Sequence, residues 1–208
     1  MTANILTFDE EQHAYYADGV RIPSVTQVIR PVAFDYDAIP AHILQHAAAR
    51  GTAVHLATEF YDDGDLDEDS VDPEILPYVE AWRLFRKDSG FVVERSEVRV
   101  HSPKHQYAGT VDCIGSIRGR RVMVEKKTTA TLWPSTAIQV TAYYKAHNET
   151  AAHAERVRSA CSVWLRCDGT YRFDAYDVGD HWAAFLALLY PEDPQSAATM
   201  AAWKARYL

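Results

Sequence analysis

Three residues, Asp112, Glu125 and Lys127, have the types and the spacing that metal-assisted chemistry requires. Residues 107–117 and 121–127 alternate as two strands on either side of a two-residue turn. That turn would place Asp112 opposite Glu125 and Thr110 opposite Lys127, with opposed Cβ atoms about 4.5–5.5 Å apart. Because side chains alternate along a strand, Glu125 and Lys127 share a face. We therefore expect two carboxylates and an ammonium group to converge.

Two carboxylates at this separation repel each other unless a cation lies between them. Mg²⁺ prefers oxygen ligands and is commonly bound by one or two carboxylates together with substrate phosphates. Such an ion polarises a phosphoryl oxygen and lowers the pKa of bound water, and Lys127 would add positive charge near the scissile phosphate. The alternative is a surface ion pair of Glu125 with Lys127 or Lys126, which contributes little to stability.

Four short motifs follow one another in the order found in one nuclease superfamily. They are Arg50-Gly51-Thr-Ala-Val-His55, Gly109-Thr-Val-Asp112, Glu125-Lys-Lys127-Thr128 and Gln139-Val-Thr-Ala-Tyr143. With these motifs and Pro23-Ser-Val-Thr26, the sequence resembles the PD-(D/E)XK nuclease superfamily, within it the RecB-like and phage-type exonuclease branch. The resemblance covers about residues 20 to 167.

The resemblance implies a role for each of these residues. Asp112, Glu125 and Lys127 would be catalytic, and the metal ligands would be His55, Asp112, Glu125 and the backbone carbonyl of Lys126. The imidazole ligand tilts the preference toward Mn²⁺ as well as Mg²⁺, because imidazole suits softer first-row ions better. The residues implied to support the site or to contact nucleic acid are Gln139, Tyr143, Thr128, Arg50 and Glu97. From the residues alone, His55 and Tyr143 could instead be packing groups, and Glu97 could belong to an exposed edge of alternating charges.

The activity implied by the resemblance is metal-dependent hydrolysis of DNA by an exonuclease of recombination, repair or phage type. Two alternatives stay open: a structure-specific endonuclease with the same site, and a nucleic-acid-binding module that keeps the fold without turnover. The implied partner is single- or double-stranded DNA, and a homo-oligomer or a recombination partner protein stays open. The chain has three cysteines, whereas the iron–sulfur cluster of some relatives needs four, so we expect no such cluster.

The net charge of −8 is unevenly distributed. The segment from Glu59 to Glu74 holds nine acidic residues and no Lys or Arg, and subtracting these nine charges leaves +1 for the rest. We interpret this segment as a solvated acidic loop. A polyanion would then depend on local basic groups and on aromatic side chains that stack on bases. The candidates are Arg50, Arg83, Arg86, Lys87, Lys104, Arg118, Arg120 and Arg121, with Trp133 and Tyr144 for stacking.

The elements that must position these residues can be predicted from periodicity and turn signals. We expect an N-terminal hairpin at 5–22, helices at 38–60 and 73–87, strands at 91–101, 107–117 and 121–127, and a helix at 134–148. A strand pair at 158–167 and 171–176 and helices at 181–189 and 196–207 complete the chain.

This order of elements predicts an α/β (α+β) fold with a restriction-endonuclease-like core, in which helices flank a mixed central β-sheet. We expect one domain, 1–208, composed of an N-terminal hairpin and helical elaboration (1–60), a nuclease core (73–177) and C-terminal helices (178–208). The start of the chain shows no basic leader, and no stretch reaches about 18 apolar residues. These features predict a cytoplasmic protein without membrane contact, in a reducing compartment.

Overall fold

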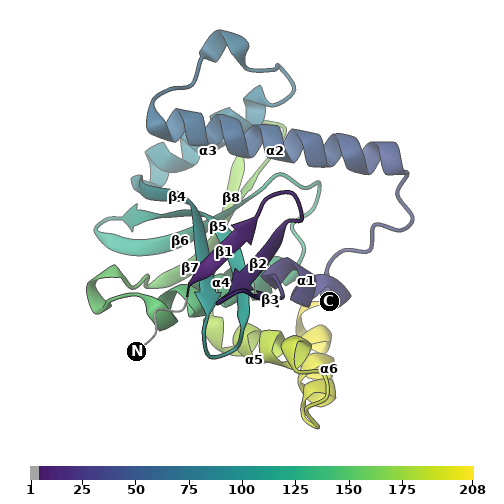
Figure 1. Ribbon diagram of the computed structural model, residues 1–208. Coiled ribbons are helices and arrows are strands. Elements are labelled where there is room, and N and C mark those ends of the chain that lie inside the picture. The colour runs from purple at the N-terminus through teal and green to yellow at the C-terminus, as the bar shows by residue number, and fades with distance from the viewer. Residues whose placement is uncertain (1–4) are drawn as a thin grey trace.

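A five-stranded sheet forms the centre of the computed structural model, which describes residues 5–208 (Figure 1). Its strands lie in chain order: β4 (Phe91–Ser102), β5 (Tyr107–Ile117), β6 (Arg120–Lys127), β7 (Ser159–Leu165) and β8 (Tyr171–Tyr176). The β6–β7 pair is parallel and the other three pairs are antiparallel. The expected mixed sheet flanked by helices is therefore confirmed. The expectation of no leader concerns the start of the chain, of which residues 1–4 lie outside the described residues.

Helices cover both faces of this sheet. On one face, α2 (Ala41–Asp63) and α3 (Leu76–Ser89) bury a cluster centred on Trp82, Phe85 and Val124. On the other face, α1 (Val25–Ile29), α4 (Ser135–Thr150), α5 (Val178–Leu189) and α6 (Ser196–Tyr207) bury Ile114, Met123 and their neighbours. In Figure 1, α2 crosses above the sheet while α5 and α6 lie below it. Apolar layers on both faces fix the position of the strands between them.

Helix α4 follows from the parallel pairing of β6 and β7. Two parallel neighbours cannot be joined by a tight turn, so the chain must cross back to the starting end of the sheet. Residues 128–158 make this crossover, and α4 occupies its middle with eleven buried residues. The helix thereby brings Gln139 and Tyr143 under the sheet near the end of β6.

The turn between β5 and β6 has the expected two residues. Arg118 and Gly119 both have positive φ, 51° and 75°, which is the geometry of the two-residue hairpin turns that match strand twist. Ile117 pairs with Arg120, and the same register continues to the pair Cys113 and Val124. The expected register is therefore confirmed over this part of the hairpin.

A second, three-stranded sheet stands at the N-terminal end of the described chain. It consists of β1 (Leu6–Asp9), β2 (Ala14–Ala17) and β3 (Val20–Ile22), so the predicted hairpin is present with one further strand. The N–H of Ala108 in β5 donates to the carbonyl of Pro23, which joins this sheet to the central one. Ser24 caps α1 with a reciprocal bond pair to Gln27.

Two sequence expectations need correction. The helix predicted to start at residue 73 begins at Leu76, because the chain first turns through the bond from the Ile75 N–H to the Asp72 carbonyl. The acidic segment is not wholly a loop: its first part forms the last turn of α2, and Glu68–Ser70 is a short 3₁₀ helix, η2. Two further 3₁₀ helices are η1 (Arg30–Val32) and η3 (His153–Glu155).

None of the helices in residues 5–208 is both long and apolar enough to span a membrane. The division of the chain into one domain with three parts stays a prediction.

Candidate metal centre

Asp112 lies buried on β5 and is held from two sides. The backbone N–H of Lys126 donates to its Oδ2 at 2.6 Å, and Nδ1 of His55 lies 3.1 Å from its Oδ1. Burial alone would raise the pKa of the Asp112 carboxyl, but the neighbouring His55 imidazole, Lys126 and Lys127 lower it to about 2. Asp112 therefore presents a negative charge at neutral pH, fixed in direction by two partners.

His55 and Glu97 bring two further ligand atoms to Asp112. One donor atom from each of the three residues lies within 4.8 Å of the other two. His55 comes from α2 and Glu97 from β4, where its neighbours pair with the residues on either side of Asp112. Glu97 has a φ of 48°, a strained conformation for a non-glycine residue and one that clusters at functional sites. Three elements distant in sequence thus converge on one point.

Glu125 and Lys127 form a close pair next to Asp112. Nζ of Lys127 donates to Oε1 of Glu125 at 2.9 Å, and the carboxylate is 4% exposed. Burial and the charge of Asp112 raise the pKa of Glu125. Burial lowers the pKa of Lys127, but the carboxylates of Glu125 and Asp112 outweigh it and hold that pKa above its usual value. Oε2 of Glu125 is buried without a hydrogen-bond partner.

These donors fit a divalent cation. A buried carboxylate oxygen without a partner is costly, and a cation is one group that would satisfy it. Carboxylates of Asp112 and Glu97 supply hard oxygen ligands, and the His55 imidazole adds a nitrogen ligand that first-row ions accept. Glu125 is not in the group that lies within 4.8 Å, and its Oε1 is bonded to Lys127. The structure therefore brings together His55, Glu97 and Asp112 and sets Glu125 beside them.

The expected pair of Thr110 and Lys127 does not form. Beyond Val124, the N–H of Lys126 bonds to the Asp112 side chain, and β6 keeps only its pairing with β7, which runs from Val122 to Lys127. Thr110 uses its hydroxyl for a 2.8 Å bond with the hydroxyl of Tyr15. The backbone pairing between β5 and β6 therefore ends at Cys113 and Val124, because the Asp112 carboxylate accepts the next N–H, that of Lys126.

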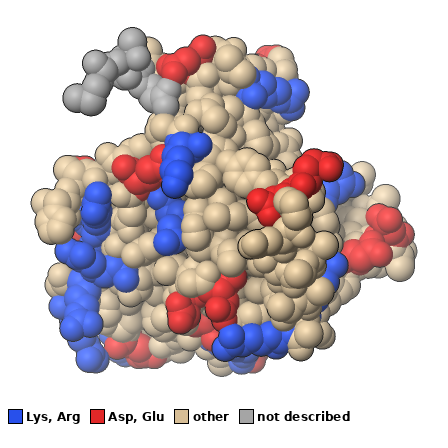
Figure 2. Space-filling model, turned by 90° about the horizontal axis from the view of Figure 1, so that it is seen from below, with Lys and Arg blue, Asp and Glu red and all other residues tan. Residues whose placement is uncertain are grey.

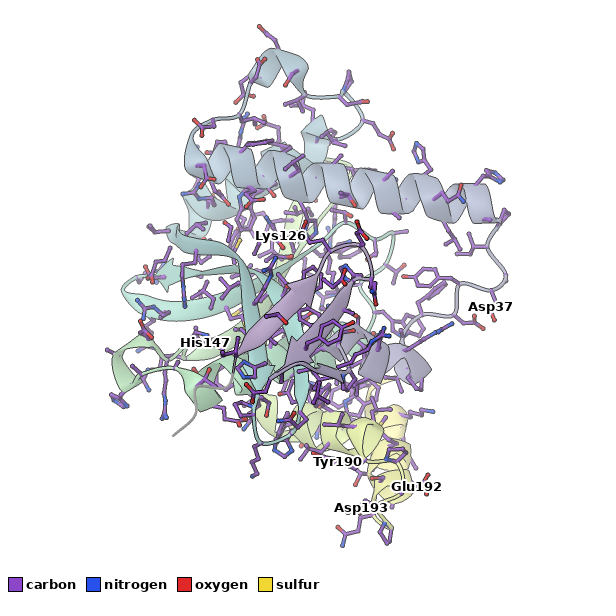
Figure 3. All side chains as sticks on the ribbon, viewed as in Figure 1. Asp37, Lys126, His147, Tyr190, Glu192 and Asp193 are labelled. Carbon is purple, nitrogen blue, oxygen red and sulfur yellow. The ribbon has the colours of Figure 1, made fainter. Side chains whose placement is uncertain are left out.

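The side chain of Lys126 lies on the face of the sheet that α2 and α3 cover, opposite to the side chains of its neighbours Glu125 and Lys127. Its Nζ donates to Oγ1 of Thr58 at 2.8 Å and lies 5.2 Å from the ring centre of Trp82. Oγ1 of Thr58 in turn donates to the carbonyl of His55 at 2.9 Å. Figure 3 places Lys126 directly below α2. This buried lysine therefore connects β6 to the helical turn that carries His55.

Gln139 and Tyr143 lie together on α4, as their spacing predicted. Nε2 of Gln139 donates to the hydroxyl of Tyr143 at 3.0 Å, and both side chains are buried. The Tyr143 ring lies so close to Gly109 that a Cβ on that glycine would be 2.3 Å from Cε1. Burial and the charges of Glu125 and Asp112 raise the pKa of Tyr143.

Thr128 and Arg50 have packing contacts at the edge of the centre. Thr128 is buried, and its Oγ1 lies 3.4 Å from where a Cβ of Gly51 on α2 would be. Nη1 of Arg50 is 3.7 Å from Oε1 of Glu74, and its guanidinium group lies over the ring of Tyr78. Arg50 is therefore engaged between α2 and α3.

A cavity of about 290 Å³ adjoins the centre and involves residues that sequence reasoning missed. Glu97, Gly109 and Tyr143 form one wall. The remaining lining residues are Phe8, His13, Tyr15, Ser24, Thr26, Arg99 and Thr110. Of these, Ser24 and Thr26 belong to the Pro23-Ser-Val-Thr26 motif and Thr110 to the Gly109-Thr-Val-Asp112 motif; nothing local marks the residues of the N-terminal sheet. The guanidinium of Arg99 lies 5.0 Å from the ring centre of Phe8.

Several arginines expected to bind a polyanion are engaged in ion pairs. Arg83 pairs with Glu68 and Glu80, Arg86 with Asp62, and Arg121 with Glu94. These partners reduce the positive charge available to a ligand. Trp133 is also engaged, since its Nε1 donates to the carbonyl of Val32.

Comparisons with known proteins add little. No family model matches the chain, and no curated protein matches it. Among solved structures, an alkaline exonuclease (LHK-Exo) from Laribacter hongkongensis is similar with a TM-score of 0.37 and 13% identity, over 86% of this chain and 93% of that chain. A likeness at this level carries no argument about the site, whose interpretation depends on its own geometry.

Proposed function

We propose that this chain is a metal-dependent nuclease that hydrolyses phosphodiester bonds of DNA. The observation that carries the proposal is the convergence of donor atoms from His55, Glu97 and Asp112 within 4.8 Å, beside the buried pair of Glu125 and Lys127. Ligands for a hard cation next to a lysine are the combination that phosphodiester hydrolysis uses. The order of motifs in the sequence supports the same conclusion.

The ion that fits best is Mg²⁺ or Mn²⁺. His55, Asp112 and Glu97, whose donor atoms lie within 4.8 Å of one another, would hold it, and the unpartnered Oε2 of Glu125 and the carbonyl of Lys126 would complete its ligands. When bound, such an ion supplies a Lewis acid for the phosphate and lowers the pKa of a water molecule. Lys127 adds a positive charge that can stabilise an oxygen of the scissile phosphate, and Glu125 keeps that ammonium in place.

Exonuclease action is the form of the activity that we favour. The cavity beside the centre is bounded by the N-terminal sheet, and Arg99 and His13 lie among its lining residues. A DNA strand that ends at this wall needs less space than a DNA strand that continues past it. A cationic side chain in the wall would also attract a terminal phosphate.

Digestion of linear and covalently closed circular DNA tests the proposal. Purified protein with Mg²⁺ or Mn²⁺ should degrade the linear DNA and leave the circle intact, and a chelator should stop the reaction. Cutting of the circle would replace the exonuclease by an endonuclease with the same site. Binding of DNA without loss of either substrate under all metal conditions would instead identify a non-catalytic binding module.

A further inference from the structure

A hollow of about 470 Å³ is separate from the metal centre. It is enclosed by the turn between β4 and β5, the C-terminal half of α4, the segment after η3, and α5. The lining residues are Lys104, His105, Tyr144, Lys145, Asn148, Glu149, Arg156, Val157, Arg158 and Trp182. None of these residues belongs to the donor cluster of the metal centre or lines the cavity beside it.

Positive charge dominates this hollow. Lys104, Lys145, Arg156 and Arg158 line it, and none of the four forms an ion pair within residues 5–208. The one acidic residue, Glu149, is occupied: its Oε2 accepts from Oγ of Ser102 at 2.6 Å, and its Oε1 accepts from the backbone N–H of Lys104 at 2.8 Å. Figure 2 shows Lys and Arg side chains gathered along the left of the view from below. A local excess of cations in a chain of net charge −8 marks a site for an anion.

Aromatic side chains lie among these cations. Nζ of Lys145 is 5.5 Å from the ring centre of Trp182, and the ring of His105 meets Trp182 edge-on at 5.3 Å. Tyr144 adds a second half-buried ring. The floor is fixed, because both amide atoms of Asn148 bond to the backbone of Val157 at 3.0 and 2.9 Å. Cations for phosphates with ring faces for bases are the combination that binds single-stranded nucleic acid.

We infer that this hollow binds the phosphates and bases of a nucleic-acid strand at a distance from the cutting site, an inference that rests on the proposed nuclease function. The path along β5 from Tyr107 to Asp112 is about 17 Å at 3.3 Å per residue, so the hollow and the centre are roughly 20 Å apart. At about 3.4 Å per phosphate along one strand, a substrate needs on the order of six nucleotides to reach both. In Figure 3, Lys126 lies below α2, and His147, the neighbour of Asn148 on α4, lies further down the sheet.

The test compares two double variants that remove equal charge. Arg156→Ala with Arg158→Ala empties the hollow of two exposed cations, and Arg21→Ala with Lys204→Ala removes two exposed cations elsewhere. Binding of labelled oligonucleotides is measured by fluorescence anisotropy with chelator present, so that cleavage does not interfere. Single strands of about four and about 20 nucleotides, and a free mononucleotide, serve as ligands over about 50 to 200 mM salt.

The longer strand should bind the arginine variant about tenfold more weakly than the wild type. Its salt slope should be smaller by about 1.4, because the variant no longer neutralises two of the phosphates. The control variant should bind the longer strand as the wild type does. Equal affinity of the longer strand for the wild type and the arginine variant would overturn the inference. So would a mononucleotide that binds as tightly as the longer strand, because the ligand would then be a free nucleotide.

A cleavage assay distinguishes failure of this inference from failure of the proposed nuclease function. With Mn²⁺, the arginine variant should cut the four-nucleotide strand at the wild-type rate and the longer strand with a raised KM. If the wild type cuts DNA but both strands are cut equally well by the variant, the hollow has no role and the nuclease function stands. If the wild type cuts nothing, the nuclease function fails, and with it the inference that depends on it.

Discussion

The backbone N–H of Lys126 donates a 2.6 Å hydrogen bond to Oδ2 of Asp112. The same residue sends its side chain through to the other face of the sheet, where Nζ donates to Thr58, and Thr58 donates to the carbonyl of His55. One residue thus holds Asp112 by its backbone and the turn of His55 by its side chain. The geometry of the two ligands is coupled through Lys126.

Replacement of Lys126 by methionine tests this coupling. Lys126→Met keeps the backbone bond to Asp112 and most of the buried volume, but it removes the charged bond to Thr58. We expect a loss of about 1.5–3 kcal/mol in the free energy of unfolding, the usual contribution of a hydrogen bond to a charged group. Mn²⁺ affinity measured by calorimetry should fall about 10- to 100-fold, as it does when a partner of a metal ligand is removed. Unchanged Mn²⁺ affinity in a less stable variant would leave Lys126 with a structural role alone.

Asp112→Asn removes the charge that the centre presents at neutral pH. The amide oxygen of asparagine can still accept from the N–H of Lys126, so circular dichroism should show an unchanged fold. Binding of Mn²⁺ should become undetectable by calorimetry, because a neutral amide replaces the central carboxylate ligand. Glu74→Gln is a matched control, since it neutralises an exposed carboxylate outside the donor cluster. Equal loss of Mn²⁺ binding in both variants would argue against a site at Asp112.

Gly109 should tolerate no side chain, whereas Gly51 should. A Cβ at Gly109 would lie 2.3 Å from Cε1 of Tyr143, whose hydroxyl is held by Gln139. We expect Gly109→Ala to cost about 1–3 kcal/mol in the free energy of unfolding, as over-packing usually does. At Gly51 the contact would be an ordinary 3.4 Å, so Gly51→Ala should gain up to about 1 kcal/mol from helix propensity. Urea denaturation of both variants checks the order, and a larger loss at Gly51 would contradict the packing described.

His181 should make stability depend on pH. Burial lowers the pKa of its imidazole, despite Asp180 and Asp177 nearby, and its Nδ1 accepts from Nε1 of Trp203 at 3.0 Å. Because the folded pKa lies below the unfolded value of about 6.5, the unfolded state binds more protons as the pH falls. The stabilisation from neutral His181 is complete above about pH 6.5 and is lost as the pH falls toward the folded pKa.

The variant His181→Gln keeps an acceptor for Trp203 and does not titrate. Its free energy of unfolding should be about 1 kcal/mol below that of the wild type at neutral pH. This difference should shrink between about pH 7.5 and 5.5, and urea denaturation at both values measures it. A difference that stays constant over that range would show that His181 does not titrate with unfolding.

The local parts of the site could be predicted from the sequence. The turn at Arg118 and Gly119 fixes the register of β5 and β6 over a few residues, so the closeness of Asp112 to the end of β6 followed from pattern alone. Gln139 and Tyr143 are one helical turn apart, so the helix expected at 134–148 puts them on one face. Both predictions depend only on residues that are close together in the sequence.

Contacts between distant segments could not be predicted in the same way. The pair of Thr110 and Lys127 failed because the Asp112 carboxylate takes a backbone bond that the ladder would otherwise form. The strained backbone of Glu97 and the wall supplied by the N-terminal sheet depend on how whole elements pack. The basic hollow joins Lys104 to Arg158, and no periodicity links residues so far apart.

Release of label from end-labelled linear DNA tests the central claim most directly. Wild type, Lys127→Ala and Lys204→Ala are compared with Mg²⁺, with Mn²⁺ and with chelator. We predict metal-dependent release by the wild type and by Lys204→Ala, and a loss of at least about 100-fold in Lys127→Ala, as when a group that stabilises the transition state is removed. Release by Lys127→Ala at the wild-type rate, or no release by the wild type with either ion, would contradict a nuclease that uses this centre.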